Sequence, residues 1–159
     1  MKIWVDADAC PGAVKGIIAA AANRRAVETV FVANKPLALP ASACITSVQV
    51  DRQADAADIY IKEHAQRFDL VVTADIPLAH ALVPMGVVVI DPRGDKFTED
   101  NIGERLSLRN LIYDLRATGE VTGGPKQFGD KEKRAFAATF DRELTRLLKD
   151  RARRSDLRT

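Results

Sequence analysis

Two aspartates spaced two residues apart are the clearest chemical signal in this chain of 159 residues. Asp6 and Asp8 stand in the run Val5-Asp6-Ala7-Asp8-Ala9-Cys10-Pro11, in which an apolar strand is followed by a proline that suits the first turn of a helix. Like charges at short range raise each other's pKa, so crowded carboxylates are unfavourable unless a cation or a reaction requires them. The pair therefore indicates a metal site or acid–base chemistry at the end of the first strand.

Further carboxylates follow later predicted strands. Asp75, in Thr73-Ala74-Asp75, comes directly after a predicted strand over 69–73, and Asp91 comes after one over 86–90. Parallel strands end at one edge of a sheet, where open α/β sheets bind ligands, so we expect these side chains to converge. We also expect the first strand, over 2–6, to lie beside the strand over 69–73 where the strand order reverses.

A predicted helix over 54–67 brings two more aspartates to the same region. Its apolar stripe passes through Ile61, and steps of three residues back along that stripe lead to Asp58 and Asp55. Carboxylates on an inward face are costly unless they are compensated. The alternative is a solvated face, on which Asp58 pairs with Lys62 one turn away.

Clustered carboxylate oxygens are the ligands that a hard divalent cation prefers, whereas no His or Cys cluster suggests zinc. The predicted ligands of Mg²⁺ or Mn²⁺ are Asp6, Asp8, Asp55, Asp58 and Asp75. Such a metal would support cleavage of a phosphodiester, with Asp6, Asp8, Asp58 and Asp75 as the predicted catalytic residues. Thr73 and Cys10 are predicted to line the site. The carboxylates near Cys10 disfavour a reactive thiolate there.

The net charge of +2 conceals an asymmetry along the chain. Residues 1–104 carry 10 Lys and Arg against 14 Asp and Glu, whereas residues 105–159 carry 14 against 8. An acidic first part and a basic second part suit a protein that binds metal at one place and a polyanion at another, although a solvated basic helix would have the same composition. The predicted nucleic-acid contacts are Arg93, Arg109, Arg116 and Lys126.

The order of elements predicts the fold class. Strands alternate with helices over residues 2–90, and apolar runs such as Gly86-Val-Val-Val-Ile90 are typical of strands covered on both faces. We therefore expect an α/β fold with three layers: a mostly parallel five-stranded sheet with helices on both faces, followed by two C-terminal helices. Thr98 is expected to cap the first of these, over 99–117, and Asp130 to cap the second. Residues 1–150 would form one domain, and the basic tail over 151–159 would be disordered.

Composition narrows the class of protein. Apolar residues make up 47% and charged residues 29% of the chain, as in globular proteins, and no apolar stretch approaches the ~20 residues that cross a membrane. Met1 leads directly into a strand-like run, and Cys10 and Cys44 lack a zinc-ligand spacing. These features predict a cytoplasmic protein with reduced thiols and no membrane partner; the oligomeric state is left open.

The motifs as a set resemble the YaiI/YqxD family of bacterial proteins. The resemblance spans about residues 2–145 and rests on the Asp6–Pro11 run together with Asp55-Ala-Ala-Asp58, Thr73-Ala-Asp-Ile-Pro-Leu-Ala79, Asp91-Pro-Arg-Gly94, Asn101-Ile-Gly103 and Gly123-Gly-Pro125. That family is in turn distantly similar to PIN-like nucleases. This similarity implies that Asp6, Asp58 and Thr73-Ala74-Asp75 hold Mg²⁺ or Mn²⁺ for cleavage of RNA. Asp8 and Cys10-Pro11 are not general features of PIN-like nucleases.

Three functions follow from these residues. The first is a metal-dependent phosphodiesterase that acts on RNA. The second is a phosphatase like the haloacid dehalogenases, in which Asp6 attacks phosphorus and Asp8 is the general acid. The third is a non-catalytic protein that binds RNA or nucleotides through its basic part.

Overall fold

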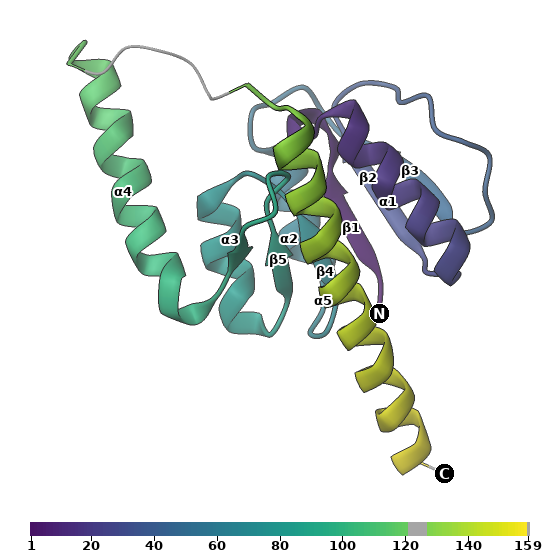
Figure 1. Ribbon diagram of the computed structural model, residues 1–159. Helices are drawn as coiled ribbons and strands as arrows, with labels where there is room; N and C mark the ends of the chain where they lie inside the picture. The colour runs from purple at the N-terminus through teal and green to yellow at the C-terminus, as the bar shows by residue number, and fades with distance from the viewer. Residues whose placement is uncertain (121–126, 159) are drawn as a thin grey trace.

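The computed structural model describes residues 1–120 and 127–158 (Figure 1). Its centre is a sheet of six strands in the order β3-β2-β1-β4-β5-β6, with β6 antiparallel to β5 and the other pairs parallel. The strands are β1 (Ile3–Asp6), β2 (Thr29–Ala33), β3 (Ile45–Gln49), β4 (Leu70–Val72), β5 (Val88–Ile90) and β6 (Lys96–Phe97). The mostly parallel α/β sheet is as predicted.

The sheet has six strands where five were predicted. The additional strand, β6, has only two residues and pairs with Val89 and Ile90 of β5. Two residues are too few to produce an apolar alternation that can be recognised in a sequence.

Helices cover both faces of the sheet, which gives the three layers that were expected. They are α1 (Gly12–Arg25), α2 (Ala56–His64), α3 (Ile76–Leu82), α4 (Glu99–Ala117) and α5 (Asp130–Leu157), with short 3₁₀ helices η1 (Ala7–Ala9) and η2 (Val83–Met85). In Figure 1, α1 and α5 lie across the near face and α2 and α3 lie behind the sheet.

The two faces of β1 show why the layers form. Ile3 and Val5 pack in one buried cluster with side chains of α1 and α5, whereas Trp4 belongs to a second cluster with α2 and α3. Successive side chains of a strand point to opposite faces, so a continuously apolar strand requires cover on both sides. The burial of each large apolar side chain contributes about 1.5–3 kcal/mol.

The central position of β1 locates the edge of the sheet at which a ligand site is expected. β1 pairs with β2 on one side and with β4 on the other, and the chain reverses its direction of winding there. This is the predicted neighbour relation of the first and fourth strands. Ligands of open α/β sheets bind outside the carboxyl ends of the strands at this point.

Two helices differ from their predicted extents. α2 is shorter than predicted, Ala56–His64 rather than 54–67, and α5 continues to Leu157, so residues 151–157 are helical where disorder was predicted. Charged residues with good helix propensity extend α5, and Arg146 pairs with Asp150 one turn later. Thr98 caps α4 as expected, but α5 begins at Asp130 and its cap is Gly129, whose N–H donates to Glu132.

No helix in the described residues is both long enough and apolar enough to span a membrane. The two thiols, Cys10 and Cys44, are both free.

Candidate functional site

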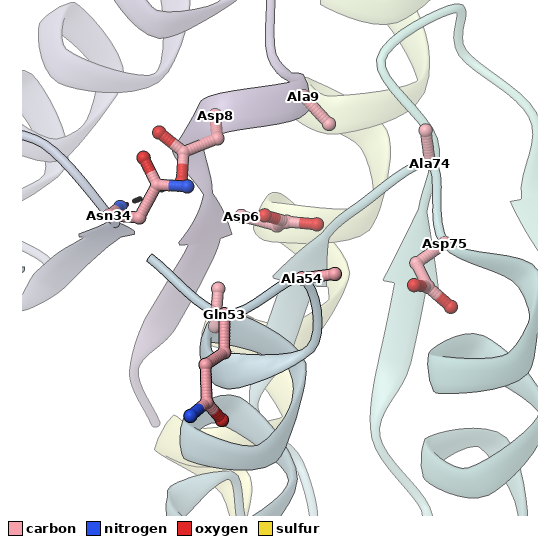
Figure 2. Close-up of a pocket in the computed structure, with 9 residues that line it drawn as sticks. Asp6, Asp8, Ala9, Asn34, Gln53, Ala54, Ala74 and Asp75 are labelled. Carbon is pink, nitrogen blue, oxygen red and sulfur yellow. Dashed lines mark hydrogen bonds between the residues drawn. The ribbon is translucent and has the colours of Figure 1, made fainter. Parts of the chain in front are cut away.

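A cavity of about 400 Å³ opens at the carboxyl end of β1 (Figure 2). The chain returns to this place after β1, after β2, before α2 and after β4. The residues that line the cavity are Asp6, Asp8, Ala9, Asn34, Gln53, Ala54, Ala57, Ala74 and Asp75. No Lys, Arg or His is among them, so the cavity has an acidic wall without a basic partner.

Asp6 is the most deeply buried of the carboxylates that line the cavity. It is the last residue of β1 and only 7% exposed, and its Oδ2 accepts a hydrogen bond of 2.9 Å from the hydroxyl of buried Thr73. The same hydroxyl oxygen accepts from the backbone N–H of Asp75 at 3.0 Å. Burial raises the pKa of Asp6, the bond from Thr73 lowers it, and the charges of Asp75 and Asp8 raise it further. The hydroxyl of Thr73 therefore orients Asp6 and links it to the backbone of Asp75.

Asp75 lies at the start of α3. One of its carboxylate oxygens accepts a hydrogen bond of 2.8 Å from the N–H of Leu78, as an N-cap residue does, and Pro77 occupies the first turn. Unsatisfied N–H groups and the helix dipole favour a negative charge at this end. The fold thus fixes Asp75 at the rim of the cavity.

Asp58 lies in the first turn of α2 and is not among the residues that line the cavity. Burial, hydrogen bonding with Asp75 and the charges of Asp75, Asp6 and Asp55 raise the pKa of Asp58 to about 8. Asp58 is half-buried, as the apolar stripe predicted, and it forms no ion pair with Lys62. Asp55 precedes the helix and is exposed. The structure therefore brings Asp6, Asp58 and Asp75 together and leaves Asp55 at the margin.

Asp8 also lines the cavity, but its carboxylate is engaged elsewhere. It is exposed on η1, and its Oδ2 accepts a hydrogen bond of 2.7 Å from the backbone N–H of Asn34. Figure 2 shows Asp8 turned toward Asn34, on the far side of Asp6 from Asp75. Asp8 therefore connects η1 to the end of β2.

Cys10 faces the core. It is 6% exposed, packs in the cluster beneath α1 and α5, and is absent from the lining of the cavity. Burial is the largest of the causes that raise the pKa of its thiol to about 12, with Lys15 lowering it and Asp6 raising it. Thr73, the other predicted lining residue, lies one layer behind the cavity surface, against Asp6.

The acidic motif after β5 has a structural role. Oδ1 of Asp91 accepts hydrogen bonds from the N–H groups of Arg93 and Asp95, which closes a tight turn. Gly94 in that turn has φ +96°, and a Cβ there would lie 2.6 Å from the backbone of Ala135 in α5. The Asp91-Pro-Arg-Gly94 run therefore allows α5 to pack closely over β5.

The predicted nucleic-acid contacts are not all in one place. Arg109 and Arg116 are exposed on α4, where they line a second cavity beside Ile76. Arg93, in the turn after β5, lies near the start of α5: its side chain is 3.8 Å from Glu132 and close to the ring of Phe128. Lys126 and the Gly123-Gly-Pro125 motif lie outside the described residues.

The donors at and beside the cavity would suit a metal that keeps most of its own water, with Asp6 and Asp75 in the cavity lining and Asp58 outside it. Asp6, Asp58 and Asp75 offer only oxygen donors, and no described Lys, Arg or His forms an ion pair with them. The described residues contain no group of three His, Cys, Asp or Glu side chains already arranged to hold an ion. This donor set suits Mg²⁺ or Mn²⁺, which bind through one or two carboxylates, water and substrate oxygens.

Asn34 and Gln53 are lining residues that the motifs did not reveal. Asn34 directly follows β2, at the same edge as Asp6, so the rule that found Asp75 would also have found it. Gln53 precedes α2 in a loop without a periodic pattern, and no signal in the sequence indicates its place. Three alanines complete the wall and leave room above Asp6: Ala54, Ala57 and Ala74.

Comparison with known proteins identifies the family. The model of the uncharacterised bacterial YaiI/YqxD family matches residues 4–146. The chain belongs to the YaiI/YqxD family. A UPF0178 protein of Myxococcus xanthus is 57% identical to it over 149 residues, which cover 94% of this chain and 97% of that protein. A UPF0178 protein of Syntrophobacter fumaroxidans is 53% identical with the same coverage. No solved structure matches the chain.

Membership of the YaiI/YqxD family confirms the resemblance that was inferred from the sequence motifs. The names of these relatives state no activity, substrate or cofactor. The case for a function therefore rests on the carboxylate site itself.

Proposed function

We propose that this YaiI/YqxD protein is a phosphodiesterase that requires Mg²⁺ or Mn²⁺ and cleaves RNA, as a distant relative of the PIN-like nucleases. The observation that carries the proposal is the convergence of Asp6, Asp58 and Asp75 beside an open cavity that no described Lys, Arg or His lines. Buried carboxylates that lack a counter-charge are costly, and a divalent cation removes that cost. Asp6 is buried and Asp58 and Asp75 are half-buried, and all three come together where the strand order of the sheet reverses.

Asp6 and Asp75 would hold the cation, and Asp58 would complete the negative charge around it. A bound cation would supply positive charge that stabilises the charge developing on a phosphodiester. Thr73 keeps Asp6 oriented through its 2.9 Å hydrogen bond, and the start of α3 keeps Asp75 at the rim. The alanine wall leaves room for a phosphodiester beside these carboxylates.

The phosphatase alternative assigns nucleophilic attack to Asp6 and proton transfer to Asp8. It requires Asp8 to face the reacting group, but Oδ2 of Asp8 accepts from the N–H of Asn34 at 2.7 Å. Asp6 also has Asp75 and Asp58 as acidic neighbours, which a metal site uses more directly. We therefore favour the phosphodiesterase over the phosphatase.

The test is cleavage of a 5′-labelled RNA by the purified full chain in Mg²⁺, in Mn²⁺ and in EDTA. The expected result is cleavage only with a metal, lowered about a hundredfold or more by Asp6→Asn and by Asp75→Asn. Asp51→Asn, at an exposed loop position outside the cavity lining, is the matched control and retains full activity. Equal cleavage by wild type and Asp6→Asn would overturn the assignment. Absence of cleavage in every metal, with RNA still bound, would instead support the non-catalytic alternative.

A further inference from the structure

A second cavity has a volume of about 370 Å³. It lies between the start of α3 and one face of α4, and its lining is Ile76 on α3 with Arg105, Leu108, Arg109, Ile112, Tyr113 and Arg116 on α4. We call this cavity the α3–α4 groove. The two cavities share no lining residue, but Ile76 of the groove directly follows Asp75 of the first cavity in the chain. In Figure 1, α4 rises beside α3 and its last turns extend beyond it.

Packing within the protein does not explain why this face of α4 carries apolar and basic side chains. Ile102 is the one buried residue among the 19 of α4. Leu108 is 52% exposed and Tyr113 is 64% exposed, although both lie on the side of the helix that faces the groove. Large apolar side chains gathered on an exposed surface mark binding sites more often than isolated ones do.

The charge of the α3–α4 groove is of one sign. Three of the seven lining residues are arginines and none is acidic. Arg105 is 3.5 Å from Asp95, which partly neutralises it. Arg109 contacts Asn110 and lies over the ring of Tyr113 at 5.4 Å, and neither Arg109 nor Arg116 forms an ion pair with a described acidic residue. The groove therefore offers arginine donors beside apolar and aromatic surface.

This combination distinguishes between two kinds of occupant. A second copy of the chain, docked by two-fold symmetry, would place the same arginines opposite one another, and like charges across an interface are unfavourable. A single-stranded nucleic acid presents phosphates to arginines and exposed base faces to an aromatic ring. A duplex offers the phosphates but hides its base faces, so it would leave Tyr113 and Leu108 without a partner.

We propose that the α3–α4 groove binds a single-stranded nucleic acid and leads it to the carboxylate site. Arg109 and Arg116 bind its phosphates, and Tyr113 stacks on a base beside Leu108. The direction of this path, from α4 to Asp75, rests on the proposed phosphodiesterase function. Binding in the groove itself requires neither the metal nor cleavage.

The test is fluorescence anisotropy with a labelled 12-nucleotide strand of mixed sequence, titrated with the full chain in EDTA so that cleavage cannot occur. RNA and DNA strands of the same sequence form separate arms, and a duplex RNA serves as competitor. The double variant Arg109→Gln/Arg116→Gln is expected to bind at least tenfold more weakly. For this variant, the slope of log K against the logarithm of the salt concentration is expected to be less steep than that of wild type by about 1.4, because two phosphate contacts are lost.

Matched variants separate the groove from general surface charge. Arg142→Gln/Lys149→Gln removes two exposed charges from α5 and is expected to keep wild-type affinity and salt dependence. Tyr113→Ala is expected to weaken binding about tenfold, whereas Tyr113→Phe retains the ring and the affinity. All the residues substituted in these variants are exposed, and circular dichroism checks that each variant folds.

The proposal is overturned if both double variants weaken binding equally, or if no strand binds. It is also overturned if the duplex competes as well as the single strand. Light scattering provides a further check, because a wild-type dimer that Leu108→Asp dissociates would show that a second copy covers the groove. Groove-dependent binding without cleavage in any metal would uphold this inference and refute the proposed phosphodiesterase. Cleavage that depends on Asp6 but not on Arg109 and Arg116 would support the proposed phosphodiesterase and refute binding in the α3–α4 groove.

Discussion

Buried carboxylates in two regions of this molecule have opposite surroundings. Glu143 of α5 has a side chain that is only 6% exposed, and it lies 2.9 Å from Nζ of Lys96 and 2.7 Å from Nη2 of Arg146. Burial alone would raise the pKa of Glu143, but hydrogen bonds from these two cations lower it below its ordinary value. At the carboxylate site the pKa values of Asp6 and Asp58 are raised, because burial and other carboxylates surround them.

The difference separates a carboxylate that is compensated within the protein from carboxylates that are not compensated by any described residue. Glu143 has its counter-charges within the protein, so it joins α5 to β6 and needs nothing further. The carboxylates at the site have no such partners among the described residues, and a cation from solution is the simplest compensation. A test of this comparison should therefore alter one region and leave the other unchanged.

Apart from loss of Asp6 or Asp75 themselves, the largest effect is expected from Thr73→Val, which removes the hydrogen bond to Asp6 with little change in the volume of the side chain. Loss of a group that orients a metal ligand lowers metal affinity by about 10–100-fold. The measurement is calorimetric titration with Mn²⁺. Thr139→Val removes a similarly buried hydroxyl that donates to the carbonyl of Gly94; neither residue lines the cavity, so it should leave Mn²⁺ affinity unchanged. Equal affinities for wild type and Thr73→Val would separate Asp6 from the metal.

Glu143→Gln tests the other region. It is expected to lower the free energy of unfolding by about 1–2 kcal/mol at pH 7, because it weakens hydrogen bonds to two charged groups that are themselves partly exposed. The folded-state pKa of Glu143 is lowered, so its stabilisation is present above the unfolded pKa of about 4.3 and is lost as the pH falls through the folded value. Urea unfolding at pH 7 and pH 3 measures this. A deficit that does not shrink between pH 7 and pH 3 would contradict the ion-pair explanation.

Asp58→Asn is expected to change stability in the opposite direction. The folded-state pKa of Asp58 is raised to about 8, so its ionisation opposes folding increasingly as the pH rises from about 4 to about 8. In EDTA, the variant should therefore match wild type near pH 4 and become the more stable protein by pH 8. Thermal unfolding across this range measures the difference. A variant that loses stability toward pH 8 would show that Asp58 is compensated within the protein.

The smallest effect is expected from Asp8→Asn. The side-chain oxygen of asparagine can still accept from the N–H of Asn34, so we expect Mn²⁺ affinity and cleavage within about threefold of wild type. The haloacid-dehalogenase alternative requires the opposite result, because it makes Asp8 the general acid. Loss of turnover in Asp8→Asn, with Mn²⁺ affinity retained, would therefore favour the phosphatase.

Much of this arrangement was predictable from local patterns. The apolar strands of the sheet and the helix over 99–117 follow from periodicity and from capping by Thr98. Asp6 and Asp75 were identified because parallel strands end at one edge. The inward position of Asp58 followed from the stripe through Ile61, which is buried.

What the sequence did not predict depends on contacts between distant segments. The engagement of Asp8 by the N–H of Asn34, and of Asp91 by its own turn, are backbone contacts that residue types alone do not specify. Cys10 follows the acidic pair but packs into the core, because the turn of η1 directs it beneath α1. The α3–α4 groove brings Ile76 beside residues 105–116, a proximity that only the folded chain reveals.

The central claim is that the carboxylates beside Asp6 bind a divalent cation, and calorimetric titration of the full chain with Mn²⁺ tests it most directly. We predict one saturable site in wild type, lost in Asp6→Asn and in Asp75→Asn and retained in Glu143→Gln, whose carboxylate already has its counter-charges. Wild-type affinity in both Asp6→Asn and Asp75→Asn, or no Mn²⁺ binding by wild type at all, would contradict the account.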